Sequence, residues 1–183
     1  MRPGGGNAPS GAEQGKQFRP DSAIMLQKIV SGGQTGVDRA ALDAAIGAGL
    51  DHGGWCPAGR RAEDGAIPER YHLHETPSKG YRQRTDWNVR DSSGTLVLVR
   101  LEPAGGTRYT VSCARRYRKP LFMIRLDGTE HAGEVVQWVD DLDISVLNVA
   151  GPRESSDSTL YDDARSFLEK VISYDRMRIP AGS

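Results

Sequence analysis

The chain has 183 residues, and its 24 Lys and Arg residues balance 24 Asp and Glu residues, so the formal net charge is +0. This length fits one domain, and the balanced charge argues against general nucleic-acid binding, which usually needs a basic surplus. No apolar run approaches the roughly 20 residues that span a bilayer. Glycine is over-represented at 22 residues, about 12%, against a usual share of roughly 7%.

Residues 1–24 are rich in Gly, Pro, Ser and Gln and contain almost nothing apolar. Such a segment cannot offset its ordering entropy, so we predict a disordered tail. Met25 opens the apolar pattern directly, and we expect it to be the native start, which an intact-mass measurement of the native protein tests. We predict a ligand-binding domain over residues 25–175 and a C-terminal tail over 176–183.

The N-terminus lacks the apolar segment of a secretory signal. The two cysteines, Cys56 and Cys113, lie far apart and show no metal-ligand spacing. Two reduced thiols in a cytoplasmic protein are the simplest interpretation.

Strand patterns and helix patterns alternate from Met25 onward. In chain order the sequence predicts a strand at 26–30, a helix at 37–48, a strand at 52–56, a long polar loop at 57–69, a weak strand at 71–75, a polar surface helix at 79–90, a strand at 95–99, a helix at 105–117, a strand at 121–126, a helix at 134–142, a strand at 144–150 and a last helix from 160. The helix at 134–142 should turn Val135, Val139 and Leu142 inward. The last helix places its apolar residues on one face: Leu160, Ala164, Phe167, Leu168, Val171 and Ile172.

This alternation, with strands that are apolar throughout, favours a mainly parallel sheet covered by helices on both faces. The predicted fold class is therefore α/β, a single Rossmann-like three-layer domain. An open sheet is favoured over a closed barrel because the chain is too short for eight strand–helix units.

Glycine is found at three predicted strand-to-helix junctions, at residues 31–36 (SGGQTG), 104–107 (AGGT) and 150–155 (AGPRES). Ligands of parallel sheets bind outside the carboxyl ends of the strands, where such junctions cluster. Glycine lets the backbone approach a ligand, and the N-terminus of the next helix favours phosphate or another anion. A single junction of this kind is more often only a turn, but three on one edge predict a ligand with an anionic group.

Four polar side chains at these junctions have specific candidate roles. Thr35 and Thr107 could cap a helix or donate a hydroxyl to the anion, and Arg39 and Arg153 could make bidentate phosphate contacts. No P-loop lysine follows any junction, and none has a full GxGxxG pattern. An ordinary nicotinamide dinucleotide is therefore not supported.

Other side chains leave alternatives open. The carboxylates of Asp38, Glu63, Asp64 and Glu154 could act as acids or bases, or be structural. The Arg60-Arg61 pair and the arginines at 115, 116 and 118 could bind phosphate or be solvated. Cys56 could be a soft metal ligand or a buried apolar residue, and Trp55 and Trp87 could stack on a heterocycle or pack internally. The four histidines lack metal-ligand spacing, and we assign no catalytic and no metal-binding residue.

Five blocks of the sequence resemble the proposed molybdenum carrier family, which is similar to circularly permuted members of the superfamily that contains YpsA, DprA and the "lonely guy" phosphoribohydrolases. The blocks are KIVSGGQTGVDRAALDAAI, HGGWCPAGRRAEDGAIP, YRQRTDWNVRDSSGTLVLV, GGT followed by a helix, and LNVAGPRES. The first two are specific, and the resemblance covers about residues 28–172. It implies a Rossmann-like homo-oligomer that binds molybdenum cofactor (molybdopterin) as cargo and passes it to molybdoenzymes as acceptors.

The resemblance also implies a set of cofactor-binding residues. They are Gly32, Gly33, Gln34, Thr35, Gly36, Asp38 and Arg39 on one side, Gly105, Gly106 and Thr107 on the second, and Gly151, Pro152 and Arg153 on the third. The implied partner is a small anionic molecule, with no nucleic acid and no membrane.

The alternative is a nucleotide-binding protein or a nucleoside-monophosphate phosphoribohydrolase-like enzyme, with Glu154 or Asp38 as the reacting carboxylate. The phosphoribohydrolases place a catalytic Glu after a PGGxGT loop. Here Arg108-Tyr109-Thr110-Val111 follows Thr107, with no Glu at that spacing.

Overall fold

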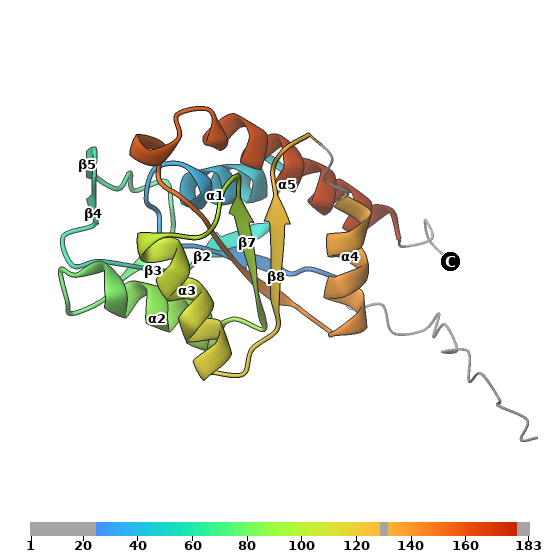
Figure 1. Cartoon of the computed structure of the whole chain (residues 1–183), viewed down its shortest axis with the longest axis horizontal. Helices are drawn as coiled ribbons and strands as arrows, with labels where there is room; N and C mark the ends of the chain where they lie inside the picture. The colour runs from blue at the N-terminus through green and yellow to red at the C-terminus, as the bar shows by residue number, and fades with distance from the viewer. Residues whose placement is uncertain (1–24, 129–131, 179–183) are drawn as a thin grey trace, which may run out of the picture.

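The computed structural model describes residues 25–128 and 132–178 (Figure 1). The tail predicted at residues 1–24 and most of the one predicted at 176–183 lie outside these ranges. The division into one domain and two tails, and the start at Met25, stay predictions.

A sheet of five strands, in the order β2-β1-β9-β7-β8, forms the centre of the fold. Its strands are β1 (Lys28–Val30), β2 (Asp51–Gly53), β7 (Gly94–Val99), β8 (Leu121–Arg125) and β9 (Val146–Ala150), and all neighbouring pairs are parallel. All six residues of β7 are buried, which explains why its apolar run gives the clearest strand pattern. The predicted parallel sheet is confirmed.

Helices cover both faces of this sheet (Figure 1). One layer consists of α1 (Val37–Gly47), α4 (Ala132–Asp141) and α5 (Leu160–Met177), and the other of α2 (Tyr81–Asp91) and α3 (Gly105–Arg116). Alternate residues of β7 face the two helix layers. Leu96 and Leu98 pack in the core of the first layer, while Val97 and Val99 pack with Val111 of α3. The predicted three-layer α/β domain is confirmed.

The first layer also anchors the two ends of the described fold. The predicted apolar face of α5 is buried, with Phe167 1% exposed. The helix runs past residue 172 to Met177 because its last turn is held: the backbone N–H of Leu26 donates to Asp175 at 3.0 Å.

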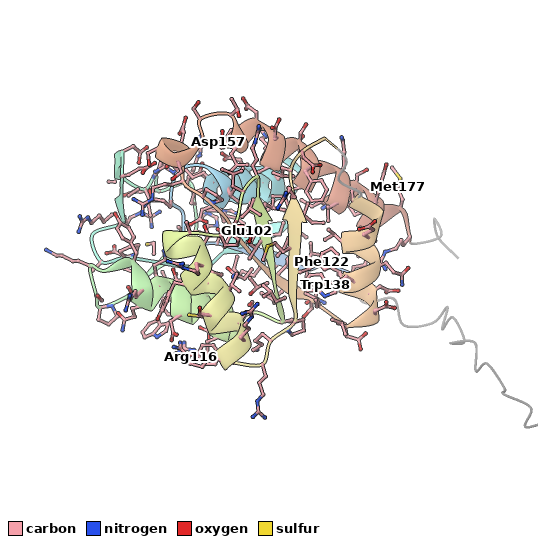
Figure 2. The ribbon with its side chains drawn as sticks, in the orientation of Figure 1. Glu102, Arg116, Phe122, Trp138, Asp157 and Met177 are labelled. Carbon is pink, nitrogen blue, oxygen red and sulfur yellow. The ribbon has the colours of Figure 1, made fainter. Side chains whose placement is uncertain are left out.

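An aromatic pair packs α4 against the edge strand β8. Phe122 of β8 stacks on Trp138 of α4 with ring centroids 5.4 Å apart (Figure 2).

Two sequence predictions about local structure are wrong. The strand predicted at 52–56 is divided, because β3 (Trp55–Cys56) leaves the central sheet to pair with β6 (His74–Glu75). The cause is a distant side chain, since Asn88 of α2 accepts the backbone N–H of Trp55 at 2.8 Å and donates to its carbonyl at 2.9 Å. Leu142 was predicted inward but is 48% exposed, because α4 ends at Asp141.

The predicted polar loop at 57–69 contains a short hairpin, β4 (Arg61–Ala62) and β5 (Gly65–Ala66), with Glu63 and Asp64 at its tip. A 3₁₀ turn, η1 (Glu154–Ser156), separates β9 from α5. Within the described residues, no helix has the length and apolar character needed to cross a membrane.

Candidate functional site

A cavity of about 520 Å³ lies beyond the carboxyl ends of β1, β7 and β9. All three glycine junctions reach it, because parallel strands end on the same edge. Its lining includes Gln34 from the first junction and Asp38 from the start of α1, Ala104, Gly105, Gly106 and Thr107 from the second junction, and Ala150, Gly151, Pro152 and Arg153 from the third. Pockets for small-molecule ligands span roughly 300–1,000 Å³, so the cavity has the size of a ligand site.

The N-terminus of α3 is open toward this cavity. Its first turn contains no acidic residue, and Ala104 at the N-cap supplies no side-chain hydrogen bond. Within the part of the chain that the structure describes, no acceptor is found for the N–H groups of Gly105, Gly106 and Thr107. A Cβ added at Gly105 or Gly106 would meet nothing within 4 Å. Unpaired N–H groups at the positive end of a helix favour an anion.

The N-terminus of α1 is occupied by protein groups instead. Asp38 is in its first turn and accepts the backbone N–H of Gln34 at 3.3 Å, while Val37 donates to the carbonyl of Pro152 at 3.3 Å. Gly36 leaves no room beside the third junction, because a Cβ there would lie 2.6 Å from the Pro152 oxygen. Of the predicted segment 31–36, only Gln34 lines the cavity. Ligand contact by Gly32, Gly33, Thr35 and Gly36 stays a prediction.

Arg39 is directed to a carboxylate rather than to the cavity. Its Nη1 and Nη2 donate to Asp64 at 2.6 and 2.8 Å, and its Nε donates to the carbonyl of Gly33 at 3.1 Å. The hydrogen bond from Arg39 lowers the pKa of the Asp64 carboxyl. Arg39 therefore already makes a bidentate contact within the chain, and its contact with a phosphate stays a prediction.

Glu63 joins the first and third junctions. Its carboxylate accepts hydrogen bonds from the Thr35 hydroxyl, from the Ser155 N–H at 3.1 Å and from the Ser155 hydroxyl at 2.6 Å. Its own N–H donates to Gln34 Oε1 at 2.9 Å. Burial alone would raise the pKa of Glu63, but the hydrogen bonds from Ser155 and Thr35 outweigh burial and lower it.

The substitution Glu63→Gln tests this link through the pH dependence of stability. A lowered pKa in the folded state means that the carboxylate stabilises the fold above its unfolded pKa, about 4.3, and that this contribution is lost as the pH falls through the folded value. Wild type should exceed Glu63→Gln by about 1–3 kcal/mol at pH 7, and the difference should shrink below pH 4 in urea unfolding. Glu69→Gln, at an exposed carboxylate of the same loop, is the control. A difference that does not change with pH would contradict the assignment.

Arg153 lines the cavity, and its guanidinium has donors available for a ligand. Its Nη1 is 3.6 Å from Glu63, longer than a hydrogen bond, and its guanidinium lies 5.3 Å from the ring centroid of Tyr81. Its side chain is 39% exposed. The structure thus places this predicted residue at the cavity with donors that are not fully used.

Two cavity arginines were missed by the sequence analysis. Arg84 of α2 has a side chain only 14% exposed and pairs with Asp38 at 2.9 Å. Arg100 follows β7 and pairs with Asp157 at 3.2 Å and with Asp163. The polar sequence of α2 predicts only a surface helix, so it cannot show that one arginine is buried. The one available signal was Asp38, a carboxylate beside the apolar face of α1 that needed a cation.

The remaining candidates lie outside the cavity lining. Cys56 is 0% exposed in a core cluster with Leu42, Ile67 and Tyr71, and burial raises the pKa of its thiol. This confirms the buried apolar interpretation. Trp55 and Trp87 pack edge-on, with ring centroids 4.7 Å apart.

Charged candidates outside the lining include Arg60 and Glu154. Arg60 donates to the carbonyls of Ile67, Leu73, Pro68 and Tyr71, so it holds its own loop together. Glu154 is exposed in η1. Over residues 25–128 and 132–178, no group of three or more His, Cys, Asp or Glu is arranged to hold a metal ion.

Comparison with known proteins agrees with this architecture. The model of the circularly permuted YpsA SLOG family matches residues 29–172. A crystal structure from Syntrophus aciditrophicus SB, of a protein named "Putative molybdenum carrier protein", is 41% identical in sequence, with a TM-score of 0.75. The alignment covers 83% of this chain and 98% of that one. None of the curated proteins compared with the chain matches it.

Proposed function

We propose that this chain, which belongs to the circularly permuted YpsA SLOG family, is a molybdenum carrier. We propose further that its cargo is molybdenum cofactor, a phosphate-bearing pterin, held in the cavity at the ends of β1, β7 and β9. The name of the similar crystal structure supports the first statement, and the geometry of the cavity supports the second.

The open N-terminus of α3 is the observation that carries the proposal. It combines unpaired N–H groups, a first turn without carboxylates and empty space over Gly105 and Gly106, all on one wall of the cavity. A phosphate there would accept backbone hydrogen bonds and lie at the positive end of the helix. The N-terminus of α1, which already contains Asp38, offers no equivalent position.

The charges of the cavity suit a single phosphate. Each cavity arginine faces a carboxylate: Arg84 faces Asp38, Arg100 faces Asp157, and Arg153 faces Glu63 at a longer distance. Little positive charge is therefore left for a polyphosphate. The lining contains no Cys and no His, so the chain offers no soft ligand to molybdenum, and the metal would stay on the dithiolene of its own pterin.

Several further parts of the proposal concern the protein in its cell. We propose that it acts in the cytoplasm as a homo-oligomer and passes its cargo to molybdoenzymes. We also propose that its ligand is a small anionic molecule rather than a nucleic acid or a membrane.

A nucleotide-processing function is the second candidate, and Asp38 is the observation that favours it. This carboxylate lines the cavity, where a general acid or base would have to lie. Against it, Asp38 is paired with Arg84, and no Glu follows Thr107 in the position used by the phosphoribohydrolases.

The test is to mix purified protein with free molybdenum cofactor, separate the complex by gel filtration and measure molybdenum and pterin in the protein fraction. Transfer of the cargo to a cofactor-free molybdoenzyme should restore that enzyme's activity. We expect stoichiometric binding and transfer. Absence of binding, together with release of free base from a nucleoside monophosphate, would favour the second candidate.

A further inference from the structure

We propose that Arg84 and Gln34 form a second binding position in the cavity, which takes a carbonyl oxygen on the heterocycle of the ligand. This inference rests on the proposed function, because it assumes that the phosphate of the same ligand lies at the N-terminus of α3. It concerns the heterocycle, which is the end of the ligand away from the phosphate.

Arg84 crosses from one helix layer to the other. It begins on α2, yet its Nη1 donates to Asp38 of α1 at 2.9 Å. The guanidinium lies directly on Gly32: a Cβ added there would be 1.6 Å from Nη1 and 2.3 Å from Cζ. A side chain at residue 32 would therefore displace the guanidinium of Arg84.

Two buried donors beside this contact have no acceptor. Gln34 is 5% exposed, and its Oε1 accepts the backbone N–H groups of Thr35 at 3.2 Å and Glu63 at 2.9 Å. These two donors fix the orientation of the amide, which leaves Nε2 as a donor without a partner within the described residues. The Nε of Arg84 lacks a partner in the same way. Buried donors are nearly always paired, and both residues line the cavity. Each of the two atoms has less than 1 Å² of accessible surface, so the proposed ligand oxygen would reach them through a small rotation of the two side chains.

The charge of this position favours a neutral acceptor over a second anion. Asp38 already balances the guanidinium of Arg84, and it is itself buried at 3% exposed. A second phosphate would add an unbalanced charge in a buried place, which is unfavourable. A ring carbonyl accepts the same hydrogen bonds without that charge. The ligand class is therefore a phosphate ester whose heterocycle has a carbonyl group, which a pterin satisfies.

The test uses inosine 5′-monophosphate and adenosine 5′-monophosphate as probes. The two nucleotides share the phosphate and sugar. They differ where one ring has a carbonyl and the other an amino group, and at the adjacent ring nitrogen, which has a hydrogen only in the inosine nucleotide. We expect wild type to bind the inosine nucleotide at least about tenfold more tightly, because a donor facing the amino group stays unpaired. Arg84→Leu should reduce this preference to about one, while competition by inorganic phosphate persists. Arg82→Leu, at an exposed arginine of the same helix, should keep the preference.

Gly32→Ala gives an independent route to the same result if Arg84→Leu does not fold. Its Cβ would occupy the place of the guanidinium, and the obstructing atoms are the far end of a flexible side chain. The variant should therefore fold and lose the preference as Arg84→Leu does.

Equal binding of the two nucleotides by wild type, with phosphate competition intact, would overturn this inference alone. A preference that survives in both variants would also overturn it. If neither nucleotide nor phosphate binds, the anion site of the proposed function fails, and this inference fails with it.

Discussion

Gly106→Leu is expected to lower affinity for molybdenum cofactor by at least about 100-fold without destabilising the protein. The residue lies in the first turn of α3 on the cavity wall, and a Cβ there meets nothing within 4 Å. The added side chain would fill the space proposed for the phosphate. Losing two hydrogen bonds to a charged group, about 1.5–3 kcal/mol each, corresponds to this factor or more, since 1.4 kcal/mol is tenfold.

Stability should be unchanged or should rise by up to about 1 kcal/mol, because leucine is a better helix former than glycine. Gly133→Leu is the matched control. Gly133 is the second residue of α4, as Gly106 is of α3, it also has open space, and it does not line the cavity. Binding by titration calorimetry and unfolding in urea should separate the two variants. Unchanged affinity in Gly106→Leu would remove the α3 N-terminus from the site.

Gly36→Ala is expected to destabilise the fold by about 2–6 kcal/mol. Its φ of +75° and ψ of −131° define a backbone conformation that is sparsely populated by L-residues and costs them roughly 1–3 kcal/mol. In addition, the new Cβ would lie 2.6 Å from the Pro152 oxygen and 2.9 Å from the Glu154 nitrogen. These are backbone atoms, which cannot swing aside, and such overpacking costs about 1–3 kcal/mol more. Against a total stability of about 5–15 kcal/mol, this loss is large.

Gly49→Ala measures the cost of a positive φ without a close contact. Gly49 has a φ of +64°, and a Cβ there meets nothing within 4 Å. It should lose only the conformational part, about 1–2 kcal/mol. Urea unfolding of both variants gives the comparison. If Gly36→Ala costs no more than Gly49→Ala, the close approach of the first and third junctions does not hold the site together.

The parts of the fold that were predictable are those in which burial repeats along the local sequence. The run in β7 and the apolar face of α5 lie in the core as their periods indicate. The division of the strand predicted at 52–56 depends on Asn88, which comes from α2 and has no local signature at Trp55. The hydrophobic pattern of the local sequence therefore predicts the helix and sheet layers, and it predicts at which edge of the sheet the site lies.

Partner choice among charged residues was not predictable in the same way. The sequence did not indicate that Arg39 pairs with Asp64, which is 25 residues away, and its contact with a phosphate stays a prediction. Arg84 was not singled out, yet it reaches Asp38 across 46 residues and packs on Gly32. An arginine at a glycine-rich junction has the same sequence signature whether its acceptor is a ligand or a carboxylate of the chain, so only the tertiary approach of the hairpin and of α2 decides between them.

A crystal structure of the chain with molybdenum cofactor bound would test the central claim most directly. We predict its phosphate at the N-terminus of α3, within hydrogen-bond distance of the N–H groups of Gly106 and Thr107, and its pterin directed toward Gln34 and Arg84. A cofactor bound outside the cavity, or a phosphate bound at Arg39 instead, would contradict the account.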